Sequence, residues 1–431
     1  MGRAQRAVSY LVIWLALTGA MATLPLRVSA QSERNPAATE ADSSSNREVA
    51  PASSQSEVVV NPPPGPVKAD ENVTWWRAIT VNGFASLSYL YNTNDPVFRI
   101  NQYRVFDYAD DEPQLDMAQI VVQRAIDKPN QFGFRLNMIA GSAVPQVTAA
   151  YGMFRNCETL QAGNFDIPEM YVSYIAPLGK GLRFDAGKFA THMGSEVIGG
   201  YDGYNDEFSR SFLFGFGVPF THTGLKATYA FNGTISAMFL VTNGWDEFQR
   251  FNNGYTFGGQ VVLTATKNTA FYFNWIHGPS MPHDNIDNRN AVEIVGSWQT
   301  TPKLKLGFDS LYAHEQNGVR IGFDAIWKSL VGYTKYQLTP RLSLALRGEV
   351  FNDSGGTRTG IPQTLHEFTL TPEYAMAAKL SRVSDHFKKF DGKFVVRGDI
   401  RLDTSNKNVF QRDDYWVDNQ FTTAVNLIYL F

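Results

Sequence analysis

Charged side chains recur at every second position of several extended segments. These charged residues are the first candidates for a chemical function. Arg397, Asp399 and Arg401 follow one another in this way, and so do Arg347 and Glu349. Side chains spaced by two lie on one face of a β-strand. Such a row of charges would keep one face of a sheet wet and act on ions or polar molecules beside it. The predicted wall residues of this kind are Arg124, Arg135, Lys188, Lys305, Arg347, Glu349, Arg397, Asp399 and Arg401.

The segment Ser209-Arg210-Ser211 and two histidines most resemble catalytic groups. No nucleophile-elbow pattern surrounds either serine, and His192 and His222 fit polar positions at the edges of a loop better than general bases. A second group gathers in one Asn-, Asp- and Pro-rich segment and comprises His277, His283, Asp284 and Asp287. Residues in such a segment are usually exposed to solvent and stabilise turns through local hydrogen bonds. We expect no catalytic step, no metal and no cofactor.

The segments that carry the charged rows alternate between apolar and polar side chains from Trp75 onward. Between Lys393 and Asp403, for example, Phe394, Val396 and Ile400 alternate with charged residues. A helix would mix the two sets on every face. The fold class is therefore predicted to be all-β. We count sixteen strands, at 78–91, 114–125, 131–141, 167–176, 181–190, 222–231, 234–243, 254–266, 269–277, 290–300, 303–314, 319–337, 341–351, 364–382, 393–403 and 421–431.

Three features of these strands indicate a transmembrane antiparallel β-barrel. Most of them run about 10 to 13 residues, which suits a tilted crossing of a bilayer. Aromatic residues collect where strands end, as at the two membrane interfaces of such barrels. Short turns alternate with long connections, which are 92–113, 142–165, 191–221, 243–253, 278–289, 352–363 and 404–419. An even strand count places both ends on the side of the short turns, which is the periplasm.

The N-terminal part has a different composition. Arg3 and Arg6 precede an apolar stretch that ends near Val28-Ser29-Ala30, so residues 1–30 are predicted to be a cleaved signal peptide, with a retained anchor as the alternative. Residues 31–72 are rich in Ser and Pro and contain no aromatic residue, which predicts a disordered periplasmic linker before a barrel over 73–431. A net charge of −3 gives no reason to expect nucleic acid, and the one cysteine, Cys157, rules out a disulfide scaffold.

Several motifs resemble the putative β-barrel porin-2 family of OmpL-like bacterial outer-membrane porins. They are Gly187-Lys188-Phe189, Gly194-Ser195-Glu196-Val197, Ser209–Gly215, Pro219–Gly224 and Asn243-Gly244-Trp245-Asp246, in this order within residues 75–431. The resemblance implies a pore-like barrel in the bacterial outer membrane and no particular substrate. The terminal Phe431, with Tyr429, also resembles the signal by which the barrel-assembly machinery recognises its clients.

We expect the function to be passive diffusion of small hydrophilic solutes or ions through a water-filled barrel. The connection 191–221 is too apolar between Phe212 and Phe220 for an exposed loop, so we expect it to fold inward and narrow the path. Its predicted constriction residues are Glu196, Asp202, Asp206, Glu207 and Arg210, with the acids set opposite the wall arginines to make a transverse field. The alternative for each wall charge is that it pairs with another and only keeps the interior wet.

Besides the solutes, the expected partners are outer-membrane lipid, the assembly machinery and further copies in a homotrimer. The alternative function is that of an occluded barrel, acting as an adhesin or an envelope-structural protein through its outer loops. An outer-membrane hydrolase is a more distant third hypothesis.

Overall fold

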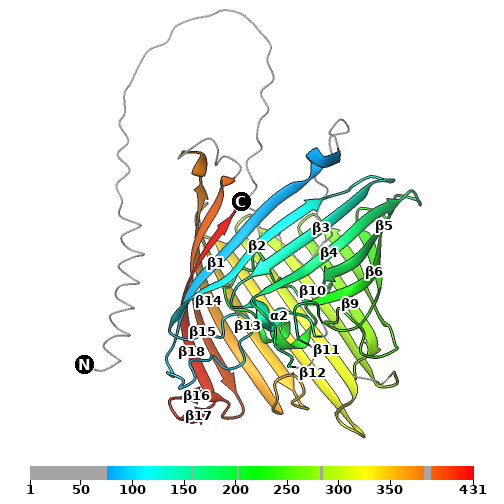
Figure 1. The fold of residues 1–431 in the computed structure, drawn as a ribbon. Helices are drawn as coiled ribbons and strands as arrows, with labels where there is room; N and C mark the ends of the chain where they lie inside the picture. The colour runs from blue at the N-terminus through cyan, green and yellow to red at the C-terminus, as the bar shows by residue number, and fades with distance from the viewer. Residues whose placement is uncertain (1–74, 151, 157–158, 201–202, 282–284, 383–389) are drawn as a thin grey trace, which may run out of the picture. The chain divides into compact units, whose positions relative to one another are not determined.

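The computed structural model describes residues 75–431, apart from 151, 157–158, 201–202, 282–284 and 383–389. The predicted signal peptide and linker, and Cys157, Asp202, His283 and Asp284, lie outside the described residues. The described chain forms a closed antiparallel β-barrel (Figure 1). None of its helices is long and apolar enough to cross a membrane.

Sixteen strands close the barrel in the order of the sequence, with β18 between β15 and β1. They are β1 (Thr80–Asn92), β2 (Glu112–Arg124), β3 (Phe132–Ala140), β4 (Phe165–Ala176), β5 (Leu182–Ala190), β6 (Thr221–Ala230), β7 (Ile235–Thr242), β8 (Thr256–Thr266), β9 (Thr269–Pro279), β10 (Asn288–Thr301), β11 (Leu304–Arg320), β12 (Phe323–Gln337), β13 (Leu342–Asp353), β14 (Gln363–Ala378), β15 (Gly392–Ser405) and β18 (Asn419–Leu430). The smaller elements are the short helices η1 (Trp75–Ala78), α2 (Val144–Val147), η2 (Leu213–Gly217) and η3 (Leu380–Arg382), and a hairpin of β16 (Phe410–Arg412) and β17 (Tyr415–Val417).

Period-two alternation decides which face of the sheet is inside. On β13, Arg347 and Glu349 are buried in the interior, whereas Val350 on the outer face is 45% exposed. Phe368 of β14 lies on the outer face in the same way. A shift of one residue would turn the charged row toward lipid, so the register is strongly specified. An apolar outer band and a polar interior are typical of a barrel that crosses an outer membrane.

The first and last strands close the barrel along a ladder that runs from Phe84 opposite Leu430 to Asn92 opposite Thr422, and the C-terminal residue extends it. Phe431 N donates to Gly83 O at 3.0 Å, and Gly83 N donates to Phe431 O at 2.9 Å. A Cβ on Gly83 would lie 2.2 Å from the Phe431 ring, so only glycine fits beneath that ring. The Tyr429 ring lies 5.7 Å from it on the same outer face. These contacts leave no unpaired strand edge at the closure.

The prediction of a sixteen-stranded antiparallel barrel is confirmed, but two connections differ from it. Strands β11 and β12 continue beyond the predicted break at 315–318 and meet only at residues 321–322. Asn317 N donates to Asp324 Oδ1 at 3.0 Å across the pair, so this turn-like sequence forms an irregularity within the hairpin. The connection between β14 and β15, residues 379–391, is also longer than the other turns at its end of the barrel.

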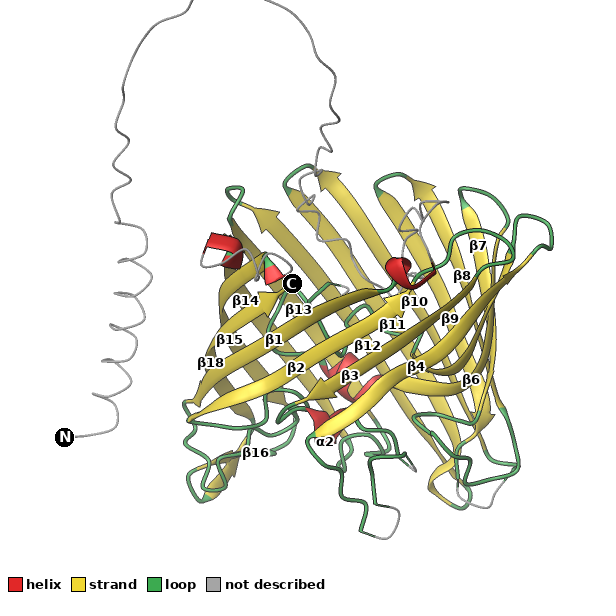
Figure 2. Ribbon diagram, turned by 45° about the horizontal axis from the view of Figure 1, so that its top comes forward, coloured by secondary structure: helices red, strands yellow, loops and turns green. Residues whose placement is uncertain are grey.

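The hydrophobic core lies inside the barrel, where long loops fold in from one end (Figure 2). The connection 93–111, α2 and η2 contribute the apolar side chains Phe106, Val147 and Phe214 to this core. Strand residues such as Trp327 and Phe351 supply the wall side of it. We call this end the loop end and the opposite one the short-turn end.

Candidate functional site

Residues 191–220, here called the inward loop, fold into the barrel and lie against β10 to β15. Carboxylates of the wall hold its backbone in place. Ser195 N donates to Asp309 Oδ2 at 2.9 Å, and Phe212 N and Leu213 N donate to the two oxygens of Glu349 at 2.6 and 2.7 Å. Such charge-assisted bonds are roughly twice as strong as neutral ones. The wall acids therefore fix the position of the loop.

Two further wall acids act in the same way on other parts of the inward loop. Gly194 N donates to Glu293 Oε2 at 2.9 Å. Phe208 N donates to Asp399 Oδ2, and the Ser209 hydroxyl donates to Asp399 Oδ1, both at 3.0 Å. Successive stretches of the loop are thus tied to strands β10 and β15, on widely separated parts of the wall.

Acidic residues of the inward loop in turn meet cations of the wall. Glu196 Oε1 lies 2.7 Å from Arg347 Nη1, and Asp206 Oδ1 lies 2.7 Å from Lys335 Nζ. Arg347 is 1% exposed and also pairs with Glu367 at 2.7 Å. Buried pairs of this kind hold firmly because removing one partner leaves an uncompensated charge.

Apolar contacts complete the anchoring of the loop. Phe212, Leu213 and Phe214 are buried beside Trp327 and Phe351 of the wall. The indole of Trp327 donates from Nε1 to Gly217 O at 2.9 Å. This run is therefore part of the core, which explains why its sequence is too apolar for an exposed loop.

The connection 93–111 covers the inward loop from the loop end. The Phe106 ring stacks on Phe214 at 5.9 Å and meets Phe220 edge-on at 6.1 Å. Arg104 is buried between Asp107 and Asp403, with Nη2 2.7 Å from Asp403 Oδ2. Two long loops therefore form one packed layer inside the barrel.

The structure places most of the predicted wall residues on the inward face. Those that are buried in the interior are Arg135, Lys305, Arg347, Glu349, Arg397, Asp399 and Arg401. Lys188 is buried as well, with Nζ 3.2 Å from Asp166 Oδ1. Most of these charged residues contact a loop or another charged residue of the wall. This is the arrangement described by the alternative above, in which each wall charge pairs with another.

Arg124 was predicted to lie on the inward face of the wall, and this prediction is wrong. The inward residues at this end of β2 are Val121 and Gln123, so Arg124 has the outward parity. Its guanidinium lies 5.4 Å from the centre of the Trp75 ring and donates to Phe132 O. It is the last residue of its strand, where the outer face reaches the membrane interface and a charge beside an aromatic ring is favourable.

The predicted constriction residues Glu196, Asp206, Glu207 and Arg210 all lie in the inward loop, and Asp202 lies outside the described residues. The predicted transverse field needs acids and cations that face each other across water. Glu196 and Asp206 instead touch Arg347 and Lys335 directly. The Arg210 guanidinium lies 4.7 Å from the centre of the Phe106 ring and donates to Val197 O and Phe208 O. In the described part of the chain, Glu196, Asp206 and Arg210 are therefore bound to neighbouring protein groups, and the transverse field stays a prediction.

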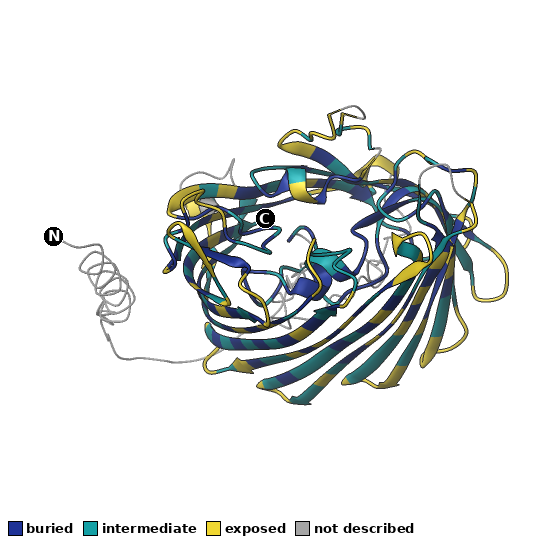
Figure 3. Ribbon diagram, turned by 90° about the horizontal axis from the view of Figure 1, so that it is seen from below, coloured by how far each residue is buried: buried dark blue, intermediate teal, exposed yellow. Residues whose placement is uncertain are grey.

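Toward the short-turn end, the inward face divides into a filled half on β12 to β15 and an accessible half on β6 to β9. Figure 3 colours the residues by their burial. Inward residues of the filled half are buried even toward the short-turn end, where Ser343 and Ala345 of β13 are 2% exposed. In the accessible half, Thr264 of β8 is exposed, and Lys226 and Thr228 of β6 are half-buried. Toward the short-turn end, water therefore reaches the wall on β6 to β9 and is excluded from it on β12 to β15. Nearer the loop end, Leu240, Gln260 and Ile276 of the β6 to β9 wall are buried as well.

A charged cluster lies on the wall of the accessible half. Asp185 Oδ1 accepts from Arg183 Nε at 2.9 Å, and Asp185 Oδ2 lies 3.6 Å from Lys226 Nζ. The Lys226 side chain is 20% exposed, and its ammonium lies 4.8 Å from the centre of the Phe189 ring. Two cations and one anion leave a net positive charge beside the water.

Sequence reasoning missed several functional positions. Glu293, Lys335 and Glu373 each contact the inward loop, and Lys226 lies in the accessible half. The sequence contained one signal for all four residues, namely a charged side chain on the polar face of a strand whose other face is apolar. What could not be found this way is the partner, because these loop contacts join residues 99 to 169 positions apart along the chain.

A closed antiparallel barrel with an apolar exterior, a polar interior and a loop folded into its lumen defines a porin of the bacterial outer membrane. The chain belongs to the family described as "Putative beta-barrel porin-2, OmpL-like", whose model matches residues 78–431. The family is one of β-barrel porins, and the protein is located in the bacterial outer membrane. No curated protein sequence matches the chain.

Solved outer-membrane channels share the fold. The outer membrane channel DcaP of Acinetobacter baumannii is 9% identical, with a TM-score of 0.52 over 82% of this chain and 97% of that one. The anion-selective porin from Comamonas acidovorans is 13% identical, with a TM-score of 0.52 over 82% and 99%. OprB of Pseudomonas putida is 10% identical, with a TM-score of 0.51 over 82% and 94%. At these identities the likeness concerns the fold alone.

Proposed function

We propose that this porin lets small hydrophilic solutes and ions diffuse passively along the accessible half of its lumen, beside β6 to β9. The observation that carries the proposal is the contrast between the two halves of one inward face. Thr264 is exposed and Lys226 is partly so, whereas Val331 and Arg401 on the opposite side are 0% exposed. Diffusion needs a continuous wet surface. Accessible inward residues supply it toward the short-turn end, and nearer the loop end the path must pass beside Leu240, Gln260 and Ile276, which are buried.

The inward loop sets the width of this path by filling the rest of the barrel. Its backbone is tied to Glu293, Asp309, Glu349 and Asp399 of the wall. Because the loop is held at so many points, the path has a fixed width, and it should sort solutes by size. In outer-membrane barrels the short turns face the periplasm and the longer loops face outward, so solutes enter past the packed layer of loops.

The charge of the accessible wall favours anions modestly. Arg183 and Lys226 share one acidic partner, Asp185, and both cations lie beside the path. A wall with one net positive charge attracts anions and repels cations over about a Debye length, roughly 8 Å at physiological salt.

Swelling of liposomes that contain the purified full chain tests passage directly. Neutral solutes of increasing size, from glycerol to a trisaccharide, are added outside in isotonic steps. The expected result is swelling at a rate that falls steeply with solute size. The control is that the protein resists denaturation, as a folded barrel does. If such protein allows no swelling with any solute, the proposed diffusion is refuted.

The densely packed interior favours one second candidate, an occluded barrel that acts through its outer loops. Phe106, Phe214 and Phe220 form a dry aromatic layer across part of the lumen. If the liposomes remain tight, an adhesin or envelope-structural role follows, and binding of intact cells to immobilised protein is the assay for it. Homotrimer formation is a separate proposal, and the mass of the detergent complex measured by light scattering tests it.

A further inference from the structure

Exposed basic residues gather at the short-turn end of the barrel. They lie in the short helix η1 before β1 and in the connections that follow β4, β8, β10, β12 and β14. We call these seven residues the basic rim: Arg77, Lys180, Lys267, Lys303, Arg341, Lys379 and Arg382. In the described parts of the turns at this end no acidic residue is exposed, and the two acids found there, Asp127 and Asp391, are half-buried.

The loop end has no such imbalance. Arg99 pairs there with Asp111 at 3.0 Å, and both side chains are exposed. The other exposed charges in the described loops of this end are of both signs, and they include Arg250, Lys407, Asp413, Asp414 and Asp418. The excess of exposed positive charge is therefore a feature of the short-turn end.

The basic rim borders the apolar outer band of the barrel. Arg77 lies in the same short helix as Trp75 and Trp76, which are 51% and 67% exposed. The turn that contains Lys267 lies next to the exposed Trp298 on the outer face of β10, because Trp298 pairs with the residue that follows this turn. Exposed tryptophans of this kind mark the interface between lipid and water, so the rim lies at the height of the lipid headgroups.

Most side chains of the basic rim have no partner in the protein. Lys180 donates from Nζ to Phe231 O at 2.7 Å. The side chains of the other six form no hydrogen bond or ion pair with any described residue. Long basic side chains can lie along an apolar surface while the charged end stays in the polar layer. The rim therefore presents cations that an anion beside the barrel can reach.

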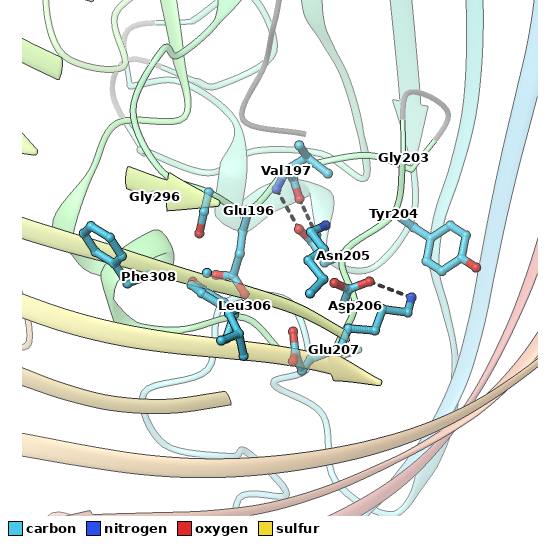
Figure 4. A pocket seen from close by; sticks show the side chains of 15 residues that line it. Glu196, Val197, Gly203, Tyr204, Asn205, Asp206, Glu207, Gly296, Leu306 and Phe308 are labelled. Carbon is cyan, nitrogen blue, oxygen red and sulfur yellow. Dashed lines mark hydrogen bonds and ion pairs between the residues drawn. The ribbon is translucent and has the colours of Figure 1, made fainter. Parts of the chain in front are cut away.

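A basic residue on the inward face at this end is in a different situation, because acids already bind it. Asp206 of the inward loop, labelled in Figure 4, has its Oδ1 2.7 Å from Lys335 Nζ. Glu373 Oε1 lies 3.7 Å from the same nitrogen. This inward charge is neutralised within the protein, whereas the charge of the basic rim is not.

We propose that the basic rim binds the headgroups of anionic phospholipids in the leaflet at the short-turn end. The exposed lysines and arginines donate to the phosphate diester, and the neighbouring tryptophans lie against the acyl chains. The bases occur on connections spread around the whole circumference, so a shell of lipids and not one bound molecule satisfies them. Basic residues beside an anionic membrane surface attract its lipids in this way.

The segment 31–72 is the rival occupant of the basic rim, because it contains seven acidic and three basic residues. Lipid is favoured over it for a simple reason. The outer band is in contact with lipid in any case, and the bases lie at the edge of that band. The two occupants give different results in the experiments below.

The test uses the full chain purified from outer membranes and placed in phosphatidylcholine bilayers. Spin-labelled phosphatidylglycerol and spin-labelled phosphatidylcholine are added to separate samples, and electron spin resonance measures the fraction of each lipid that the protein immobilises. Association of phosphatidylglycerol should be at least threefold stronger. The preference should fall toward equality in about 1 M KCl, where the Debye length is roughly 3 Å. Equal association of the two lipids at low salt would overturn the proposal.

Two sets of substitutions locate the binding surface. The rim variant changes four exposed bases without a protein partner, by Arg77→Gln, Lys267→Gln, Lys303→Gln and Arg341→Gln. The control variant changes four exposed bases of the loop end, by Arg99→Gln, Arg250→Gln, Arg320→Gln and Lys407→Gln. The lipid preference should be lost in the rim variant and kept in the control. Equal loss in both would assign the preference to the net charge of the molecule and overturn the assignment to the rim.

A full-length variant in which the seven acids of segment 31–72 become amides separates the two occupants. The preference for phosphatidylglycerol should be the same as in the native chain. A preference that is present only in this variant would show that the segment occupies the rim, and it would overturn the proposal.

Single-channel recording of the rim variant keeps this surface distinct from the proposed diffusion. Its conductance and reversal potential in a KCl gradient should equal those of the native chain, although its lipid preference is lost. A changed reversal potential with an intact lipid preference would show that the bases act on permeating ions and not on lipid.

Discussion

At the scale of single residues, the lumen contains two kinds of charge. Those of the filled half, such as Arg347 and Glu349, are buried and hold the inward loop. Those of the accessible half, above all Lys226, lie next to water. The first kind should therefore control stability, and the second kind should control selectivity.

Lys226 offers the direct test of selectivity. Lys226→Glu reverses the sign of the net charge that Arg183, Asp185 and Lys226 present to the path, so the preference for anions should change to one for cations. Lys226→Gln should give an intermediate reversal potential under the same salt gradient. The same reversal potential in all three proteins would show that ions do not pass beside this cluster.

Arg347 offers the direct test of stability. Arg347→Met leaves Glu196 without its buried cation and leaves Glu367 with Arg401 alone, at 3.5 Å, which should cost about 3 to 5 kcal/mol. The temperature at which the compact gel band disappears should fall clearly. Arg124→Met, on the outer face, is the control and should shift that temperature little. If this temperature fell equally in Arg347→Met and Arg124→Met, the result would contradict the distinction between buried wall residues and residues at the membrane interface.

At the scale of elements, the strands could be predicted because a strand that separates lipid from water has to alternate. The inward loop could be predicted for a similar reason, since the run from Phe212 to Phe220 is too apolar to remain in water. The contacts that fix this loop could not, because backbone amides such as Ser195 N and Phe212 N carry no sequence signal. Arg124 was misplaced because polar residues occur on both faces where a strand meets the interface.

Removal of the inward loop tests its role in setting the width of the path. Replacing residues 200–216 by a short Gly-Ser linker should raise single-channel conductance severalfold, since the loop packs against the wall inside the lumen. Replacing the hairpin tip at 321–322, where Ile321 is 92% exposed, is the control and should leave conductance unchanged.

If the barrel with the replaced loop does not fold, Glu349→Gln provides a second test of the role of the inward loop. It weakens the hold on Phe212 N and Leu213 N without removing a residue. Larger fluctuations of the open current are expected. Unchanged conductance in the loop-replaced barrel, with quiet currents in the point variant, would show that the loop does not define the path.

At the scale of the whole molecule, the C-terminal residue joins the ends of the sheet. Phe431→Ser removes the ring that lies over Gly83, together with the terminal aromatic that resembles the assembly signal. The amount of folded barrel in outer membranes should fall several-fold. Phe421→Ser, on the outer face at the other end of β18, is the matched control. Normal amounts of the Phe431 variant would show that neither the ring nor the signal is needed.

The central claim, that a continuous wet path runs beside β6 to β9, is tested most directly by single-channel recording. Full-length protein purified from outer membranes is placed in a planar bilayer, with different KCl concentrations on its two sides. The account predicts stable open steps and a reversal potential of the sign that anion preference gives. A barrel that is folded, as judged by its heat-dependent gel shift, and yet never conducts would contradict it.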